Sequence, residues 1–337
     1  MRRVIGILIG VLAAFGPAAD SAAQAPDIKA LQAKYVRPRE IPFPADNPFN
    51  QRQVDLGRML FFDKRIGFNG EIACASCHLP GLGWGDGVAN SPAPLGHVMP
   101  RHTSGLANLA WDTLFNWDGR ADTLEKQMLT AMSGPAMNTP ERELVGKVKG
   151  IPGYAPLFAR AFPGPRDAIT AQTIAQAVAQ YERTIVSGKA PFDLWVEGDD
   201  NALGDEAKAG FVLFNGKAMC AECHSTWRFT DGKFHDIGLP GDDIGRGRLF
   251  PGDIKAQYAF KTPSLRDVVL SAPFFHDGSA ATLMDVINVY DKGGIKRPSL
   301  SDKIRPLGLT FAERRQLIAF MSSLTGASVY EKVPELP

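Results

Sequence analysis

The chain has 337 residues, and at roughly 100–200 residues per domain this length favours two domains over one. Hydrophobic residues make up 45% and charged residues 22%, which excludes a mostly disordered chain, while 34 glycines and 25 prolines predict long ordered loops. The formal net charge of +1 is too small for an electrostatic nucleic-acid binder.

The first 23 residues have the layout of a secretory signal peptide. Two arginines precede an apolar run over residues 4–15, and the small residues Ser21-Ala22-Ala23 follow it. A membrane anchor is the alternative, but the run is shorter than the roughly 20 residues that span a bilayer. We therefore expect residues 1–23 to be cleaved after export, which leaves a periplasmic protein that is not integral to the membrane.

All four cysteines lie in two copies of one pattern. Cys74-Ala75-Ser76-Cys77-His78 and Cys220-Ala221-Glu222-Cys223-His224 both read C-x-x-C-H, the attachment pattern of c-type heme. The two thiols of a pair can form thioethers with the two vinyl groups of one heme, and the adjacent histidine then faces the iron. Neither of the alternatives, a redox dithiol and a four-cysteine zinc site, requires a histidine after both pairs. We therefore predict two covalent hemes c, with His78 and His224 as proximal ligands.

Three further segments are predicted to be helices. Residues 168–187 are strongly helical, and residues 205–214 have helical spacing and lead into the second cysteine pair. A third helix is expected from Thr310, its N-cap, to Thr325, where a glycine follows. The first of these helices must end near residues 188–191, which contain a glycine and a proline, so we expect a domain boundary there.

The function of each heme depends on what occupies the face of the iron opposite its proximal histidine. If protein ligands fill both faces, a heme only passes electrons, whereas an open face can bind peroxide or oxygen. The residues alone do not choose between an electron carrier and an enzyme. Four histidines remain as candidate ligands: His97, His102, His235 and His276.

Seven short motifs around the two cysteine pairs carry a family resemblance. They are Leu56-Gly57-Arg58-Met59-Leu60-Phe61-Phe62-Asp63, Trp117-Asp118-Gly119-Arg120-Ala121, Leu124-Glu125-Lys126-Gln127, Ile151-Pro152-Gly153-Tyr154, Tyr181-Glu182-Arg183-Thr184, Lys261-Thr262-Pro263-Ser264-Leu265-Arg266 and Phe275-His276-Asp277-Gly278-Ser279. In this order and spacing, from about Asn47 to Gly326, the chain resembles the bacterial diheme cytochrome c peroxidase and MauG superfamily.

The resemblance implies a mostly α-helical fold of two cytochrome c-like domains, each with one covalent heme c. With the boundary above, we place an N-terminal peroxidase/MauG-type heme domain at residues 24–192 and a C-terminal cytochrome c-type heme domain at residues 193–337. The resemblance also implies that hydrogen peroxide reacts at the first heme. The second heme is then the six-coordinate entry point for electrons.

The resemblance places the sixth ligand of the second heme fourteen residues after His276, which is Tyr290. Peroxidases of the superfamily have methionine there, whereas MauG has tyrosine. Thr282 is a predicted N-cap that would place Tyr290 on a short helix. A tyrosine packed in the core is the alternative reading, and Met284 is the alternative ligand. A phenolate favours ferric and higher-valent iron, so Tyr290 indicates MauG-like chemistry.

Three more site residues follow from the resemblance. Trp117 matches a tryptophan that lies between the two hemes and can relay an electron or a hole; a packed aromatic is the alternative. Gln127 matches a glutamine of the distal pocket of the first heme. His97, nineteen residues after His78, matches a histidine that closes the first heme until activation, although a plain loop histidine is the alternative.

The sequence departs from the family pattern at two places. His102 stands where the family has an asparagine that helps to bind calcium between the domains, and because calcium prefers oxygen ligands, a calcium site is doubtful here. Ala136, in Gly134-Pro135-Ala136-Met137-Asn138, stands where the family has a distal glutamate, and one residue is missing there. Glu141 and Glu143 follow closely but have the positions of a first helical turn.

The sequence therefore predicts an exported diheme peroxidase-type oxidoreductase. Its expected partners are hydrogen peroxide and either a small cytochrome c or cupredoxin as electron donor or a protein substrate, and a homodimer is possible. The competing prediction is a non-enzymatic diheme electron carrier in which both irons are six-coordinate.

Overall fold

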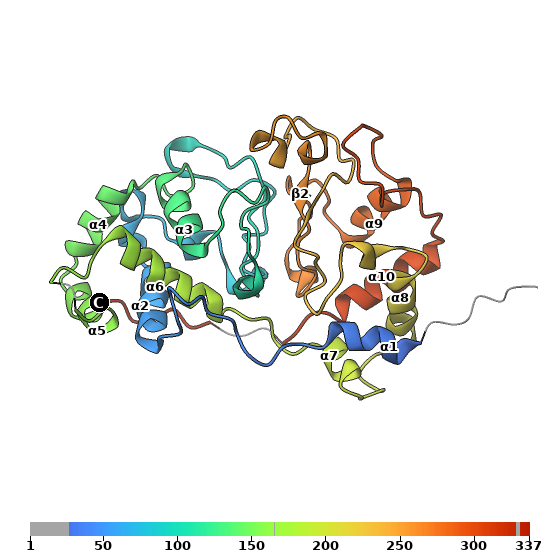
Figure 1. Cartoon of the computed structure of the whole chain (residues 1–337), viewed down its shortest axis with the longest axis horizontal. Coiled ribbons are helices and arrows are strands. Elements are labelled where there is room, and N and C mark those ends of the chain that lie inside the picture. The colour runs from blue at the N-terminus through green and yellow to red at the C-terminus, as the bar shows by residue number, and fades with distance from the viewer. Residues whose placement is uncertain (1–26, 165, 328–330) are drawn as a thin grey trace, which may run out of the picture.

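The computed structural model describes residues 27–164, 166–327 and 331–337, so the predicted signal peptide lies outside the described residues. The fold is mostly helical, as expected, and its one sheet within these ranges is a pair of two-residue antiparallel strands (Figure 1). The helices are α1 (Ile28–Gln32), α2 (Gln51–Phe62), α3 (Leu124–Ser133), α4 (Glu141–Lys149), α5 (Tyr154–Ala161), α6 (Ala171–Thr184), α7 (Pro191–Val196), α8 (Asp205–Asn215), α9 (Leu283–Lys292) and α10 (Phe311–Ser322). The strands are β1 (Phe234–His235) and β2 (Phe260–Lys261).

The apolar side chains form two main cores. The first core is built from α2 to α6, and the second from α8 to α10 together with α7. These two parts, called the first half and the second half below, lie side by side in Figure 1. The chain does not divide cleanly at one point, because α1 and Tyr35 pack in the second half before the chain enters the first. No helix within the described ranges is long and apolar enough to cross a membrane.

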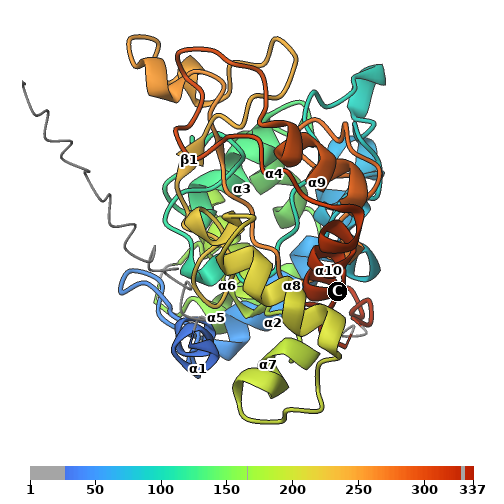
Figure 2. The ribbon, with the colours of Figure 1, turned by 90° about the vertical axis from the view of Figure 1, so that its right-hand side faces the viewer.

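The same helix crossing holds each half together. In the first half α2 packs on α6 at Gly57, where a Cβ atom would lie 1.8 Å from the carbonyl oxygen of Ala177. In the second half α8 packs on α10 at Gly210, where a Cβ atom would lie 2.0 Å from the carbonyl oxygen of Gln316. Figure 2 views the molecule from the side of α8 and α10, which lie against each other. Only a glycine allows backbones to approach this closely.

The helix ends follow the predicted caps. Thr282 and Thr310 each accept a hydrogen bond from the backbone N–H three residues on, and so cap α9 and α10. Helix α6 lies inside the predicted segment 168–187 and α8 covers the predicted segment 205–214. Helix α10 ends at Ser322, three residues earlier than expected. Beyond it, the N–H of Gly326 donates to the carboxylate of Asp267 instead of continuing the helix.

An internal repeat relates the two halves. The N–H of Asn108 donates to the carbonyl of Ile185 after α6, and the N–H of Asp267 donates to that of Leu324 after α10. Two matching backbone bridges follow, Phe115 with Ala121 and Phe274 with Ala280. Residues 103–131 therefore correspond to residues 262–290, at a constant separation of 159 positions. The repeat makes it possible to compare equivalent positions of the two halves one by one.

Candidate heme sites

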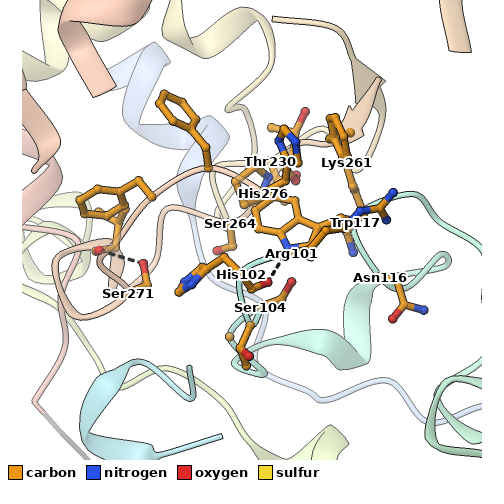
Figure 3. Close-up of a pocket in the computed structure, with 18 of the residues that line it drawn as sticks. Arg101, His102, Ser104, Asn116, Trp117, Thr230, Lys261, Ser264, Ser271 and His276 are labelled. Atoms are coloured by element: carbon orange, nitrogen blue, oxygen red, sulfur yellow. Dashed lines mark hydrogen bonds between the residues drawn. The ribbon is translucent and has the colours of Figure 1, made fainter. Parts of the chain in front are cut away.

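One cavity of about 960 Å³ lies between the halves, and Figure 3 shows part of its lining. The cavity reaches both C-x-x-C-H motifs. It is lined by Cys77 and His78 from the first half and by Cys220, Cys223 and His224 from the second. Cys74 is packed against the first core. This volume is at the upper end of the roughly 300–1,000 Å³ of small-molecule and cofactor pockets.

The two proximal histidines are held in the same way. Nδ1 of His78 donates to the carbonyl of Trp84 and Nδ1 of His224 donates to that of Phe229, both at 2.8 Å. Since a carbonyl can only accept, each Nδ1 carries the proton and each Nε2 is left as a free metal ligand. Trp84 and Phe229 have φ values of 64° and 57°, a left-handed conformation that is unusual for large side chains.

The residues present fit a heme at each motif and do not fit a four-cysteine zinc site. The four thiols are free of disulfides. Among the described residues, the group placed to hold a metal ion combines Cys223 with Asp231 and His235 and not the two cysteine pairs. Burial also lowers the pKa of His78 and of His224, which keeps both imidazoles neutral as iron ligation requires.

Helix α3 forms the cavity wall of the first half. It presents Leu124, Gln127 and Ala131, three and four residues apart and therefore on one face. Ala136 lines the cavity just beyond the helix. Glu141 and Glu143 occupy the first turn of α4, as expected, and are exposed. No glutamate is among the described residues that line the cavity.

Helix α9 forms the equivalent wall of the second half. It presents Leu283, Val286 and Tyr290 with the same spacing. Burial, followed by the neighbouring Cys223 and Cys220, raises the pKa of Tyr290. Met284, the alternative ligand considered from the sequence, is not among the lining residues.

Trp117 lies between the two halves and is held by one hydrogen bond from its side chain and one to its backbone. Its indole N–H donates to the carbonyl of His102 at 2.9 Å, and its own carbonyl accepts from the N–H of Lys261 at 2.8 Å. The ring meets His276, the equivalent residue of the repeat, edge to face at 6.5 Å. The imidazole of His276 in turn stacks on Phe260 at 3.6 Å. Figure 3 shows Trp117, His102 and His276 together in the cavity.

Ion pairs join the two halves around this cavity. Arg101 contacts Asp118 of the first half at 2.7 Å and Asp243 of the second at 2.6 Å. Burial alone would raise the pKa of Asp243, but the hydrogen bonds from Arg101 and from a backbone N–H lower it well below its usual range. Asp112 of the first half likewise pairs with Arg228 and Lys261 of the second.

The structure does not bring every predicted residue to the cavity. His97 follows an exposed turn, is itself exposed and is not among the lining residues, so its role as a ligand stays a prediction. Ala131 and Asn116 are among the lining residues that the sequence did not single out. The side-chain nitrogen of Asn116 is buried and has no hydrogen-bond partner among the described residues. A comparison of the motif at 115–121 with that at 274–280 would have exposed the repeat and, through it, Ala131.

A mostly helical fold with two C-x-x-C-H motifs on one cavity defines a diheme cytochrome of the peroxidase type. The family model described as di-haem cytochrome c peroxidase matches residues 51–201. The chain belongs to the diheme cytochrome c peroxidase and MauG family, as the sequence motifs predicted, and it is a peroxidase-type oxidoreductase. The family implies two heme cofactors.

Named relatives cover nearly the whole chain. The methylamine utilization protein MauG of Methylorubrum extorquens is 48% identical over 92% of this chain and 89% of its own. The cytochrome c551 peroxidase of Nitrosomonas europaea is 31% identical over 88% of this chain and 86% of its own. The crystal structure of a MauG-like protein associated with microbial copper homeostasis superimposes with a TM-score of 0.80 and 30% identity, covering 87% of this chain and 94% of that one.

Proposed function

We propose that this protein is a periplasmic enzyme that reduces hydrogen peroxide at a covalent heme c held by Cys74, Cys77 and His78. A second covalent heme c, held by the C-terminal motif, passes electrons. One observation carries the proposal: the repeat pairs Ala131 with Tyr290. A methyl group cannot ligate iron and leaves that face of the first heme open, whereas a phenol can close the same face of the second.

The residues around the first site would bind and orient peroxide. A heme at this site supplies an iron that binds peroxide and accepts or releases electrons. The carbonyl of Trp84 holds His78 in one tautomer and orientation on the proximal side. On the other side, the amides of Gln127 and Asn116 are the donors available to a bound oxygen atom. Ala136 offers no carboxylate, so the residue at this position cannot act as the general acid–base group that moves a proton between the peroxide oxygens.

Trp117 is proposed as the relay between the two hemes. It lies between the halves, contacts the second half through Lys261 and is held rigidly by His102. Tyr290 supports MauG-like oxidation of a protein substrate over the alternative, a peroxidase fed by a small cytochrome c or a cupredoxin. The relative of highest identity described above is a methylamine utilization protein, which agrees with this preference.

Resting-state spectroscopy tests the proposal. Mass spectrometry of the mature protein should first show two heme additions. Its EPR spectrum should then contain one high-spin ferric heme, from the open first site, and one low-spin ferric heme. Two low-spin hemes would identify an electron carrier instead.

The Tyr290→Phe variant tests the assignment of the closed site. We expect the low-spin signal to become high-spin or to shift as another ligand is recruited, because phenylalanine cannot ligate iron. Tyr154→Phe is the control, since Tyr154 is a buried tyrosine that lies in the first core. An unchanged low-spin signal in Tyr290→Phe would exclude Tyr290 as the ligand.

A further inference from the structure

Three aromatic rings form a triangle beside each of the two proximal histidines. In the first half the rings belong to Phe61, Trp84 and Tyr181, and their centroids lie 5.3–6.5 Å apart. In the second half the triangle is Phe214, Phe229 and Phe320, with centroids 5.0–5.9 Å apart. The triangles are equivalent, because Trp84 and Phe229 bind the proximal histidines and the other rings come from the crossed helix pairs.

In the second half, three phenylalanines fill the triangle, so packing alone requires no other kind of aromatic side chain. The first half nevertheless has an indole and a phenol at two of the three corners. Both are side chains that can lose an electron, whereas phenylalanine cannot under the same conditions. The Trp84 and Tyr181 rings stand beside each other at 6.5 Å, and Phe61 links them to His78 at 6.4 Å. The two oxidisable rings are therefore found at the site that the proposed function assigns to peroxide.

The hydroxyl of Tyr181 is buried and has, among the residues that the structure describes, no hydrogen-bond partner that could hold its proton in place. Burial is the largest cause that raises the pKa of Tyr181, and the carboxylate of Glu331 follows. Glu331 is paired with Arg58 at 2.5 Å, and both are partly exposed. The aromatic path thus runs from the proximal side of the first site to an ion pair at the surface.

We propose that Trp84 and Tyr181 form an exit path for oxidising equivalents that find no donor at the first heme. This inference rests on the proposed function, in which hydrogen peroxide is the oxidant. In each step Tyr181 loses one electron through Trp84 to the oxidised first site, and its phenolic proton passes to the neighbouring Glu331 carboxylate once the two groups move into hydrogen-bond contact. A one-electron reductant in the surrounding solution then restores the electron to Tyr181, and Glu331 returns the proton. The path protects the site from self-oxidation.

The experiment mixes the holoprotein with hydrogen peroxide in the absence of a donor and freezes it for EPR. We expect a tyrosyl radical signal that is lost in Tyr181→Phe and is slower to form in Trp84→Phe. Both substitutions should fold, because Tyr181→Phe removes only an unpaired hydroxyl and Phe320 and Phe229 occupy the equivalent positions. Peptide mapping after longer exposure should find oxidation at Tyr181, and heme bleaching should be faster in Tyr181→Phe.

Two tyrosines serve as controls. Tyr154 lies in the same core but donates to Asp63, and Tyr35 stacks on Phe229 in the second half but donates to the amide of Asn215. Tyr154→Phe and Tyr35→Phe should keep the radical. A signal that survives in Tyr181→Phe, or that never forms although the heme spectrum responds to peroxide, would overturn the exit path alone. A heme spectrum that does not respond to peroxide would overturn the proposed function as well.

Discussion

In the first half of the molecule the helix that faces the cavity carries Ala131, and in the second half it carries Tyr290 at the same place. The backbones agree in their crossed helices, their capped wall helices and their bridges, yet the side chains at equivalent positions differ in kind. Gln127 occupies the position equivalent to Val286, and Trp117 the position equivalent to His276. The comparison supports the proposal that one backbone frame carries an open and a closed heme site, which differ by single side chains on the wall helix.

The largest effect on the hemes is expected when α3, the wall helix of the first half, is given the tyrosine of α9, the wall helix of the second half. Ala131→Tyr places a phenol on the open face, so the first site should become low-spin and stop reacting with peroxide, because a heme closed on both faces only passes electrons. EPR and stopped-flow mixing measure the two effects. Ala131→Phe is the control for bulk, and its first heme should stay high-spin. A first site that remains reactive in Ala131→Tyr would show that the two positions are not equivalent.

The next effect concerns the missing carboxylate. Ala136→Glu should accelerate the step in which the O–O bond breaks, because a positioned general acid–base group contributes about 10²–10⁴-fold. The rate is measured by stopped-flow spectroscopy with peroxide. Ala136→Gln has the same size without the acid and should not accelerate the reaction. If Glu141→Gln or Glu143→Gln slowed the parent protein, these exposed residues would have to reach the cavity, contrary to their positions on α4.

The helix crossings should be intolerant of any side chain. Gly57→Ala should destabilise the fold by about 1–3 kcal/mol, because the added methyl group overlaps the Ala177 carbonyl and the backbones must separate. Gly210→Ala should behave alike in the second half. Gly146→Ala in α4 is the control: its added Cβ meets no atom within 4 Å, so it should stabilise the helix slightly. Urea unfolding of the holoproteins measures all three, and equal stabilities would refute the close crossings.

The last effect is a dependence of stability on pH. We expect it from Glu182 of α6, whose counterpart on α10 is the uncharged Met321. Burial is the largest cause that raises the pKa of Glu182 to about 8, and one of its oxygens has no hydrogen-bond partner among the described residues. Between its ordinary value of 4.5 and about 8, the folded chain holds a proton that the unfolded chain releases. The free energy of unfolding therefore falls as pH rises through this window.

Glu182→Gln removes that dependence. The variant should gain about 1–3 kcal/mol over the parent protein near the upper end of the window and little below it. Urea midpoints at several pH values measure the difference. A parent midpoint that rises with pH across the window would contradict the assignment. Glu143→Gln is the control, because Glu143 is exposed and should not change the slope.

Local sequence patterns predicted several of the helices well, among them α6, α8 and α10. The capping threonines of α9 and α10 satisfy backbone groups within a few residues, so their effect is visible in the sequence alone. The C-x-x-C-H motifs likewise carry their chemistry in five adjacent residues. The early end of α10 was not predictable, because it depends on Asp267, which is distant in the sequence.

Contacts between distant segments explain what the sequence analysis missed. Ala131 has no chemical function of its own, and its importance appears only when the two halves are compared position by position. The packing of α1 in the second half depends on Tyr35 fitting among Phe192, Phe211 and Phe229, which no local pattern reveals. The oxidisable triangle likewise joins three segments of the chain.

If Trp117 is the relay proposed above, its hydrogen bond to His102 favours one kind of radical. Its indole N–H is given to the His102 carbonyl, which is a poor base, so an electron can leave while the proton stays. The positive charge then remains on the indole ring and can be passed to the next redox group without a proton transfer. Tyr181, beside the Glu331 carboxylate, is expected to lose proton and electron together and so to hold a neutral radical. Trp117 is thus suited to passing charge on, and Tyr181 to holding the oxidising equivalent until a reductant restores the electron.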